Sequence, residues 1–162
     1  MVRQANINDI DKINDMFLNV VLWMKENKQK QWLFRDLDWG KIPFNITDFY
    51  ICFDPKSTAV GFLILSPLDI NNLWNEWEFS NSLYVYKLAV KREYAKQGFS
   101  TELLNFSKDF AKQKNYSNLC LYCQTKRLKL RDFYERNGFV FAGQHTIKGE
   151  TDTSSFYVCK IN

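Results

Sequence analysis

A glycine-containing turn between a strand and a helix is the stretch of this sequence best suited to chemistry. An apolar strand ends at Val90, a polar turn with Gly98 follows, and an amphipathic helix begins near Phe99 or Ser100. The first N–H groups of a helix have no partner inside it, and the helix dipole places partial positive charge there. A pyrophosphate can therefore bind at such an end through several backbone N–H groups. Gly98 would let the backbone come close to it, and Ser100 could add a hydroxyl donor.

The same local pattern is also typical of an ordinary connection in which the glycine only makes the turn, because short glycine motifs occur often by chance. Lys91, Arg92 and Lys96 place positive charge around the turn, which suits an anionic ligand. The local pattern leaves both alternatives open.

This stretch resembles the acetyl-CoA motif of the GNAT family of N-acetyltransferases, which reads (Arg or Gln)-x-x-Gly-x-(Gly or Ala) and follows a strand ending in Leu-Ala-Val. The strand here ends in Leu88, Ala89 and Val90, and the six motif positions are Ala95, Lys96, Gln97, Gly98, Phe99 and Ser100. Ala95 lacks the basic or amide side chain of the pattern, and Ser100 replaces Gly or Ala. The backbone amides of the motif would survive both changes, but Ala95 loses one side-chain contact, which predicts weaker binding of the cofactor.

A second segment is similar to the same family. Residues 133–139, Phe-Tyr-Glu-Arg-Asn-Gly-Phe, resemble the family segment Leu-Tyr-Glu-Lys-x-Gly-Phe. The resemblance implies that Tyr134 is the catalytic acid that protonates the departing thiolate, and a phenol with a pKa of about 10 suits that role. A core aromatic side chain at helical spacing is the alternative for Tyr134. Two motifs in the right order, with a strand between them, are more specific than either alone.

The resemblance also implies how a cofactor would bind. Acetyl-CoA is the expected acyl donor, and no metal is expected. The implied contacts are the main chain of residues 88–90 with the pantetheine and the thioester, one of these amides as the oxyanion donor, and residues 95–101, up to Thr101, with the diphosphate. Arg127 occupies the position where many relatives carry an asparagine that contacts the cofactor, so it is a further cofactor-binding candidate.

The residues that would bind the acceptor are less clearly indicated by the sequence than those that would bind the cofactor. Many relatives carry a glutamate as general base on or near the central strand, where this sequence has Tyr84 and Tyr86. Glu76 and Glu78, on the loop before that strand, are substitutes that would act through water, although a solvated loop charge is the more common reading of each. These two carboxylates, with Trp32 and Tyr84, are the candidates for acceptor binding, because acidic side chains beside aromatic rings suit a cationic amine.

The elements that must position these residues follow from hydrophobic periodicity. The expected strands cover residues 2–5, 49–53, 60–65, 83–90, 119–123, 139–142 and 156–160, and the expected helices cover residues 9–28, 99–114 and 130–137. Hairpins come first and crossover helices later, so the expected fold class is α/β with a mixed sheet. The resemblance implies a GNAT-like acyl-CoA N-acyltransferase fold, with a central, mostly antiparallel sheet, a splayed strand pair and helices on both faces.

Length and composition favour one domain over residues 1–162. The net charge is +4, and a nucleic-acid binder usually carries a denser basic stripe, so no nucleic acid is expected as partner. No apolar run is long enough for a membrane span and the start lacks the pattern of a signal peptide, which predicts no membrane partner and a cytoplasmic location. The expected partner is a small-molecule or protein amine acceptor, and a homodimer is compatible with the sequence.

Two features are weaker candidates for chemistry. Cys120 and Cys123 have the spacing of a metal-ligand pair, but residues three apart on a strand point to opposite faces, and no second close pair would complete a zinc site. His145 follows an expected strand and is interpreted as a surface residue in a polar loop.

Three functions remain open on the sequence. The first is an acetyl-CoA-dependent N-acetyltransferase that moves an acetyl group to a primary amine by direct attack in a ternary complex. The second is a catalytically inactive acyl-CoA-binding regulatory module, favoured by the irregular motif and the missing base. The third is a nucleic-acid or protein interaction domain with a basic, aromatic surface, for which salt-dependent binding without CoA would be expected.

Overall fold

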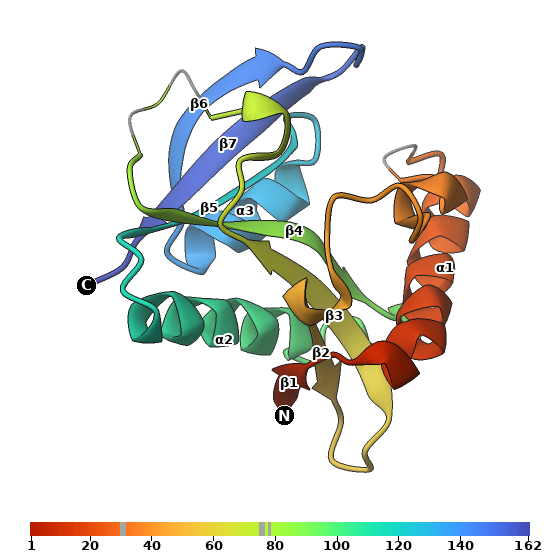
Figure 1. The fold of residues 1–162 in the computed structure, drawn as a ribbon. Coiled ribbons are helices and arrows are strands. Elements are labelled where there is room, and N and C mark those ends of the chain that lie inside the picture. Colours follow the sequence, from red (N-terminus) through yellow and green to blue (C-terminus); the bar gives the residue numbers. More distant parts are fainter. Residues whose placement is uncertain (30–31, 75–76, 78) are drawn as a thin grey trace. The chain divides into compact units, whose positions relative to one another are not determined.

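The computed structural model describes residues 1–29, 32–74, 77 and 79–162, and its regular elements follow the expected order (Figure 1). The strands are β1 (Val2–Gln4), β2 (Phe49–Phe53), β3 (Ala59–Ser66), β4 (Ser82–Val90), β5 (Asn118–Gln124), β6 (Val140–Thr146) and β7 (Thr153–Lys160). The longer helices are α1 (Ile10–Glu26), α2 (Phe99–Gln113) and α3 (Leu128–Arg136). Short 3₁₀ turns include η1 (Ile7–Asp9), η2 (Phe34–Leu37) and η5 (Arg92–Tyr94). Helix α3 begins two residues earlier than predicted, and β6 and β7 are longer.

The strands form one mixed sheet in the order β1-β2-β3-β4-β5-β7-β6. The β1–β2, β2–β3, β5–β7 and β6–β7 pairs are antiparallel, whereas β4 and β5 are parallel. This arrangement confirms the predicted α/β class with a mostly antiparallel sheet.

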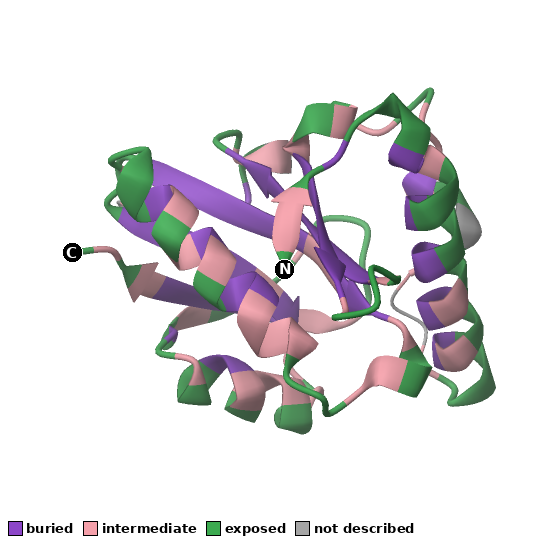
Figure 2. Cartoon of the chain, turned by 90° about the horizontal axis from the view of Figure 1, so that it is seen from below, coloured by how far each residue is buried: buried purple, intermediate pink, exposed green. Residues whose placement is uncertain are grey.

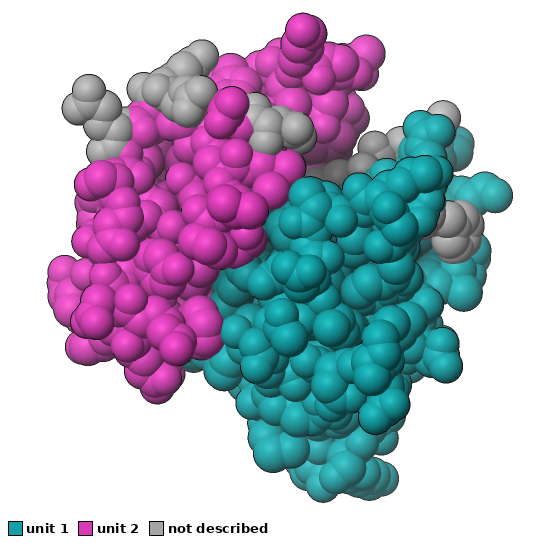
Figure 3. Space-filling model, in the orientation of Figure 1, with its two compact units in different colours: residues 1–65, 86–106 teal, residues 66–85, 107–162 magenta. Residues whose placement is uncertain are grey.

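The chain divides into two compact units, coloured separately in Figure 3. The first comprises Met1–Leu65 and Tyr86–Phe106, and the second comprises Ser66–Val85 and Ser107–Asn162. Strand β4 and helix α2 each begin in one unit and end in the other. One functional domain over residues 1–162 stays a prediction.

Helix α1 supplies much of the core of the first unit. Its buried side chains recur every three or four residues and therefore share one face (Figure 2); they are Ile13, Met16, Phe17, Val20, Val21 and Met24. Trp39 packs on Phe49 of β2 with ring centroids 5.0 Å apart, and Phe49 packs on Phe62 of β3 at 5.9 Å. These contacts fix the segment after α1 against the strands of the same unit.

The carboxylate of Asp9, which directly precedes α1 and is 1% exposed, stabilises the start of this helix. Arg3 of β1 donates two hydrogen bonds to it, of 2.7 and 2.9 Å, and Lys12 donates another of 3.0 Å. The Arg3 guanidinium is the main cause that holds the pKa of Asp9 well below its usual range. Strand β1 and α1 are thereby joined by a buried carboxylate with strong donors.

Strand β4 is irregular in the part that belongs to the first unit. Lys87 has a φ of 47°, a left-handed conformation that non-glycine residues adopt uncommonly. Four residues later the N–H of Lys91 donates to the carbonyl oxygen of Val60 at 2.8 Å, so the end of β4 lies beside β3. The approach is close, because a Cβ on Gly61 would lie 2.7 Å from the carbonyl oxygen of Ala89.

The second unit is centred on β5. This strand pairs with β7 along its whole length, but its parallel pairing with β4 joins only Ser82–Tyr84 to Asn118–Cys120. Both strands continue beyond this pairing, as a splayed strand pair predicts. His145 lies within β6 rather than in a polar loop, and its ring stacks on Phe156 with centroids 4.4 Å apart. The loop interpretation of His145 was wrong, because the strand extends further than its apolar residues indicate.

Candidate functional site

The turn before α2 has the backbone geometry of an anion-binding site. Lys96 and Gly98 have positive φ values of 65° and 91°, and alternating backbone conformations of this kind point successive N–H groups into a concave nest. The first helical hydrogen bond runs from Glu102 N to Gly98 O at 2.9 Å, so the N–H groups of residues 99–101 have no acceptor inside the helix. A Cβ built on Gly98 would have no atom within 4 Å. The turn is therefore open on the side of Gly98.

Helix α1 positions this turn through side chains that the sequence motifs do not include. Asn19 accepts a hydrogen bond from Arg92 N at 2.9 Å and donates one to Glu93 Oε2 at 3.2 Å. Lys91 forms an ion pair with Asp15 of α1 at 2.5 Å, so much of its charge is already neutralised. The guanidinium of Arg92 lies 3.9 Å from the centroid of the Trp23 ring. The turn η5 is thus fixed to α1 before the motif begins.

The residues of the motif and Thr101 are either exposed or half-buried. Lys96, Gln97 and Gly98 are exposed, while Ala95, Phe99, Ser100 and Thr101 are half-buried. Gln97 Nε2 donates to the carbonyl oxygen of Glu93 at 3.0 Å, which ties the turn back to η5. The ring of Tyr94 meets that of Phe99 edge to face at 6.0 Å. These contacts shape the turn from its flanks and leave its backbone exposed.

The strand that leads into this turn contains the predicted thioester contacts. Ala89 and Val90 are 3% and 8% exposed, and Leu88 is half-buried, so their side chains pack while their main chain follows the irregular part of β4. Directly before them, the Lys87 ammonium lies 5.5 Å from the centroid of the Phe17 ring and 5.2 Å from that of Trp32.

Trp32, a predicted acceptor contact, stacks on Phe17 of α1 with ring centroids 5.6 Å apart and an interplanar angle of 21°. Burial lowers the pKa of Lys87, while the Asp36 carboxylate acts in the opposite direction. The structure thus brings Trp32 next to the strand that ends in the motif, as part of a cluster of Lys87, Phe17 and Trp32 that sequence reasoning missed.

Tyr134 and Arg127 lie in the second unit. Tyr134 is on α3 and is 7% exposed, with its ring 6.1 Å from those of Phe139 and Tyr157. Burial raises the pKa of Tyr134, Cys123 adds to the rise, and the nearby guanidinium of Arg127 opposes it. The phenol therefore stays protonated and can donate a hydrogen bond, but in the free protein it is a weaker acid than its ordinary pKa indicates.

The other acceptor candidates are placed as follows. Tyr84 is 8% exposed, and its ring packs on Trp74 with centroids 5.9 Å apart. Burial raises the pKa of Tyr84. Glu76 and Glu78 lie outside the described residues.

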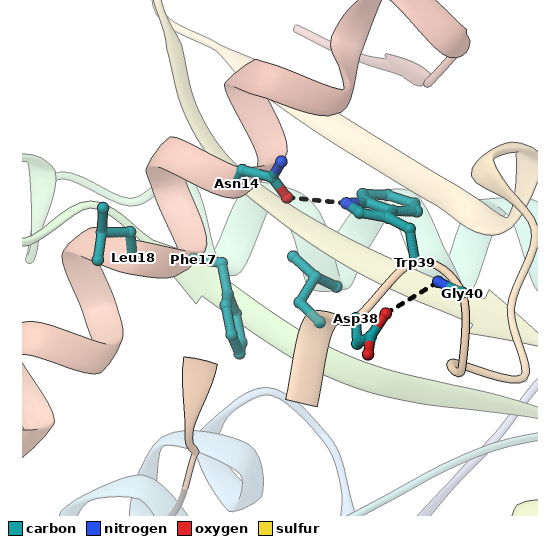
Figure 4. A pocket seen from close by; sticks show the side chains of 7 residues that line it. Asn14, Phe17, Leu18, Asp38, Trp39 and Gly40 are labelled. Carbon is teal, nitrogen blue, oxygen red and sulfur yellow. Dashed lines mark hydrogen bonds between the residues drawn. The ribbon is translucent and has the colours of Figure 1, made fainter. Parts of the chain in front are cut away.

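A pocket of about 470 Å³ opens in the first unit beside α1. Asn14, Phe17 and Leu18 of α1 line one side, and residues 37–40 line the other (Figure 4). Trp39 Nε1 donates to Asn14 Oδ1 at 2.8 Å, and Gly40 N donates to Asp38 Oδ1 at 3.1 Å. The first hydrogen bond joins the two sides of the pocket, and the second shapes the loop that holds the carboxylate.

The four cysteines are free thiols, and the ranges described contain no group of three or more His, Cys, Asp or Glu side chains placed to hold a metal ion. Burial raises the pKa of Cys52 and Cys120 to about 12 and that of Cys123 to about 11. Within those same ranges, every helix is too short or too polar to cross a bilayer.

Comparison with known proteins gives matches to a family model, to a named relative and to solved structures. Residues 13–139 match the model of the acetyltransferase (GNAT) family. A Bacillus subtilis (strain 168) protein named uncharacterized N-acetyltransferase YesJ is 25% identical over 145 residues, which are 86% of this chain and 81% of that protein.

Solved structures of other acetyltransferases have the same fold, among them the following two. An acetyltransferase of the GNAT family from Listeria monocytogenes has a TM-score of 0.77 and 23% identity, with 99% of this chain and 94% of that chain covered. The PaiA N-acetyltransferase from Thermoplasma acidophilum, in complex with coenzyme A, has a TM-score of 0.73 and 20% identity, with 99% and 98% covered. These likenesses confirm the fold that the two motifs imply.

Proposed function

Because the chain belongs to the acetyltransferase (GNAT) family, we propose that it moves an acetyl group from acetyl-CoA to a primary amine by direct attack in a ternary complex. The observation that carries the proposal is the open turn at Gly98. There the backbone N–H groups of residues 99–101 precede the first helical hydrogen bond, and no atom lies where a Gly98 side chain would begin.

Acetyl-CoA would be held mainly by main-chain groups. The diphosphate binds the N–H groups of the turn and of the first residues of α2, where the helix dipole adds to the attraction. The exposed side chains of Lys96 and Gln97 border this site, and the hydroxyls of Ser100 and Thr101 lie on the first turn of the helix. Residues 88–90 offer their main chain to the pantetheine. Ala95 contributes no polar side chain, so its position adds little affinity.

The proposed reaction is a direct acyl transfer. The neutral amine nitrogen attacks the thioester carbon, the C–N bond forms, and the C–S bond breaks with departure of the CoA thiolate. A backbone N–H of residues 88–90 stabilises the oxyanion. Tyr134 donates its proton to the thiolate and recovers one from solvent, and Arg127 lies close enough to make the phenol more acidic than burial alone would. The amine proton passes to water, with Glu76 and Glu78 as candidate bases.

Substitution of Ser100 tests the diphosphate site without disturbing the fold. Ser100→Asp places a carboxylate at the start of α2, which suits the helix dipole but repels a diphosphate. Ser100→Asn introduces a side chain of nearly the same shape as aspartate but without its charge. We expect calorimetry to show acetyl-CoA binding by the natural chain and by Ser100→Asn, and binding at least about tenfold weaker by Ser100→Asp, since tenfold is 1.4 kcal/mol. Equal affinity of the two variants for acetyl-CoA would show that the turn is not part of the diphosphate site.

A second experiment detects acetyl-CoA binding through its effect on the free energy of unfolding. Acetyl-CoA at a hundred times its dissociation constant should raise the free energy of unfolding by about 2.7 kcal/mol. The turnover test then uses a panel of amines and detects released CoA. Binding without turnover of any amine would favour the inactive acyl-CoA-binding module.

A further inference from the structure

The pocket beside α1 combines apolar walls with a single carboxylate. Phe17, Leu18 and Trp39 give it aromatic and aliphatic surface, and among the described residues that line it Asp38 alone carries a charge. Its volume of about 470 Å³ falls within the range of small-molecule sites, which are mostly apolar with a few polar groups that set orientation. Figure 4 shows the Phe17 side chain leaving α1, with Asp38 and Trp39 on a separate segment. The lining therefore suits an apolar ligand with one cationic group.

The carboxylate of Asp38 is available to such a ligand. Its partner in the structure is the ammonium of Lys41 at 3.0 Å, but the Lys41 side chain is 84% exposed. Exposed pairs of this kind contribute little and exchange easily with solvent. The hydrogen bond from Gly40 N orients the carboxylate at the same time. A ligand ammonium can replace that of Lys41 without loss of the orientation of the loop.

The pocket is connected to the strand proposed to hold the thioester. Phe17 lines the pocket and also lies under the Lys87 ammonium. Lys87 directly precedes Leu88, the first of the residues whose main chain we assign to the thioester. Only the Lys87 side chain would therefore separate β4 from a ligand group bound against Phe17. All of these residues belong to the first unit.

The charges disfavour a polyamine. A polyamine needs several carboxylates along its length, whereas the lining described here offers Asp38. The Lys87 ammonium, beside Phe17, repels a second positive charge at this end of the pocket, and the Asp36 carboxylate offsets part of this repulsion. A single ammonium avoids both costs.

We propose that this pocket binds the acceptor as a primary monoammonium ion with an aromatic or aliphatic body, with the ammonium at Asp38 and the body against Phe17 and Trp39. The inference rests on the proposed function. The ammonium first loses a proton to water, which frees the neutral amine from Asp38 to attack the thioester carbon as described above. The amide product is neutral, so it has no charge attraction to Asp38 and leaves more readily than the substrate.

The test measures binding directly, with three probes. They are 2-phenylethylamine, its neutral acetamide N-(2-phenylethyl)acetamide, and spermidine. Calorimetry on the full chain should show binding of 2-phenylethylamine. The acetamide should bind about tenfold or more weakly, as expected for loss of a charge-assisted hydrogen bond. Spermidine should also bind more weakly, because it lacks an aromatic body and its further positive charges find no carboxylate in the described lining. Asp38→Asn should weaken 2-phenylethylamine by a similar factor. Asp11→Asn, which alters an exposed carboxylate of α1 outside the pocket, should leave it unchanged.

Three outcomes would overturn the inference: spermidine bound more tightly than 2-phenylethylamine, equal affinity of Asp38→Asn and the natural chain, or no heat with 2-phenylethylamine. Acetyl-CoA binding is measured separately on the same preparation. If acetyl-CoA binds while 2-phenylethylamine does not, the acceptor class is wrong and the proposed function stands. If acetyl-CoA does not bind, the proposed function fails whatever the result for the amine.

Discussion

The ammonium of Lys87 lies 5.2 Å from the centroid of the Trp32 ring, and the backbone of Lys87 is left-handed although this residue lies inside β4. An irregular residue in a strand interrupts the strict alternation of side chains between the two faces. Here the interruption falls directly before Leu88, where we assign the thioester contacts. The same residue therefore shapes the strand and links it, through Trp32 and Phe17, to α1.

Lys87 offers a test of this backbone conformation. Lys87→Val and Lys87→Asn both remove the ammonium and its contacts with the rings, but a β-branched residue disfavours the left-handed region whereas asparagine tolerates it. We expect Lys87→Val to be less stable than Lys87→Asn by about 1 kcal/mol in urea unfolding. Equal stability of the two variants would mean that φ at this position is not left-handed in solution.

Asp9 should make the stability of the chain depend on pH. Asp9→Asn removes a buried charge that accepts hydrogen bonds from Arg3 and Lys12, and we expect a loss of roughly 2 kcal/mol at pH 7. Because the folded pKa of Asp9 lies below its ordinary value, its contribution is present above about pH 4 and is lost as the pH falls.

Urea unfolding at pH 7 and near pH 2.5 measures this dependence. The difference between Asp9→Asn and the natural chain should shrink at the lower pH. Asp11→Asn serves as the control because its carboxylate is exposed, and it should change stability little at either pH. A constant difference across the pH range would contradict the assignment to ionised Asp9.

Asn19 should act as a positioning residue for the turn. Asn19→Ala removes the hydrogen bonds to Arg92 N and Glu93, so η5 is held less firmly before the motif. We expect the dissociation constant for acetyl-CoA to rise about five- to tenfold, the equivalent of one neutral hydrogen bond. Asn105→Ala, on an exposed face of α2, should leave the constant unchanged. An unaltered affinity in Asn19→Ala would show that the turn keeps its shape without α1.

Tyr134→Phe tests the proton donor. The ring would be retained in its buried site, so the fold should survive. We expect kcat to fall about a hundredfold, typical of the loss of a general acid, while the dissociation constant for acetyl-CoA changes less than about twofold. Calorimetry and steady-state kinetics on one preparation separate these effects. A kcat equal to that of the natural chain would leave Tyr134 with a packing role alone.

Much of the fold could be predicted because its signals are local. The helical spacing from Ile13 to Met24 predicts α1, and the structure buries that face. The two motifs predict the family, which the match over residues 13–139 confirms. Gly98 was predicted to make a close backbone approach, and its positive φ and open surroundings fit that interpretation. The role of the turn in binding stays a prediction.

The remaining features depend on tertiary contacts that the sequence pattern does not mark. The resemblance implies an irregular strand over residues 86–90, but lysine has no preference for a left-handed φ, so the residue type does not indicate that the irregularity falls at Lys87. Asn19 lies in the middle of α1 and looks like a solvated polar residue until η5 is placed beside it. The pocket at Asp38 requires residues 37–40 to fold back on α1, and its short 3₁₀ turn has no long periodicity that would predict this.

The buried thiols make the protein unreactive toward reagents that attack sulfur. A thiol reacts as its thiolate, and pKa values of about 12 for Cys52 and Cys120 and about 11 for Cys123 keep these three protonated at neutral pH. Burial raises the pKa of Cys159 as well. Sulfhydryl dyes should therefore report newly liberated coenzyme A over a low protein background, and alkylating agents should spare the interior.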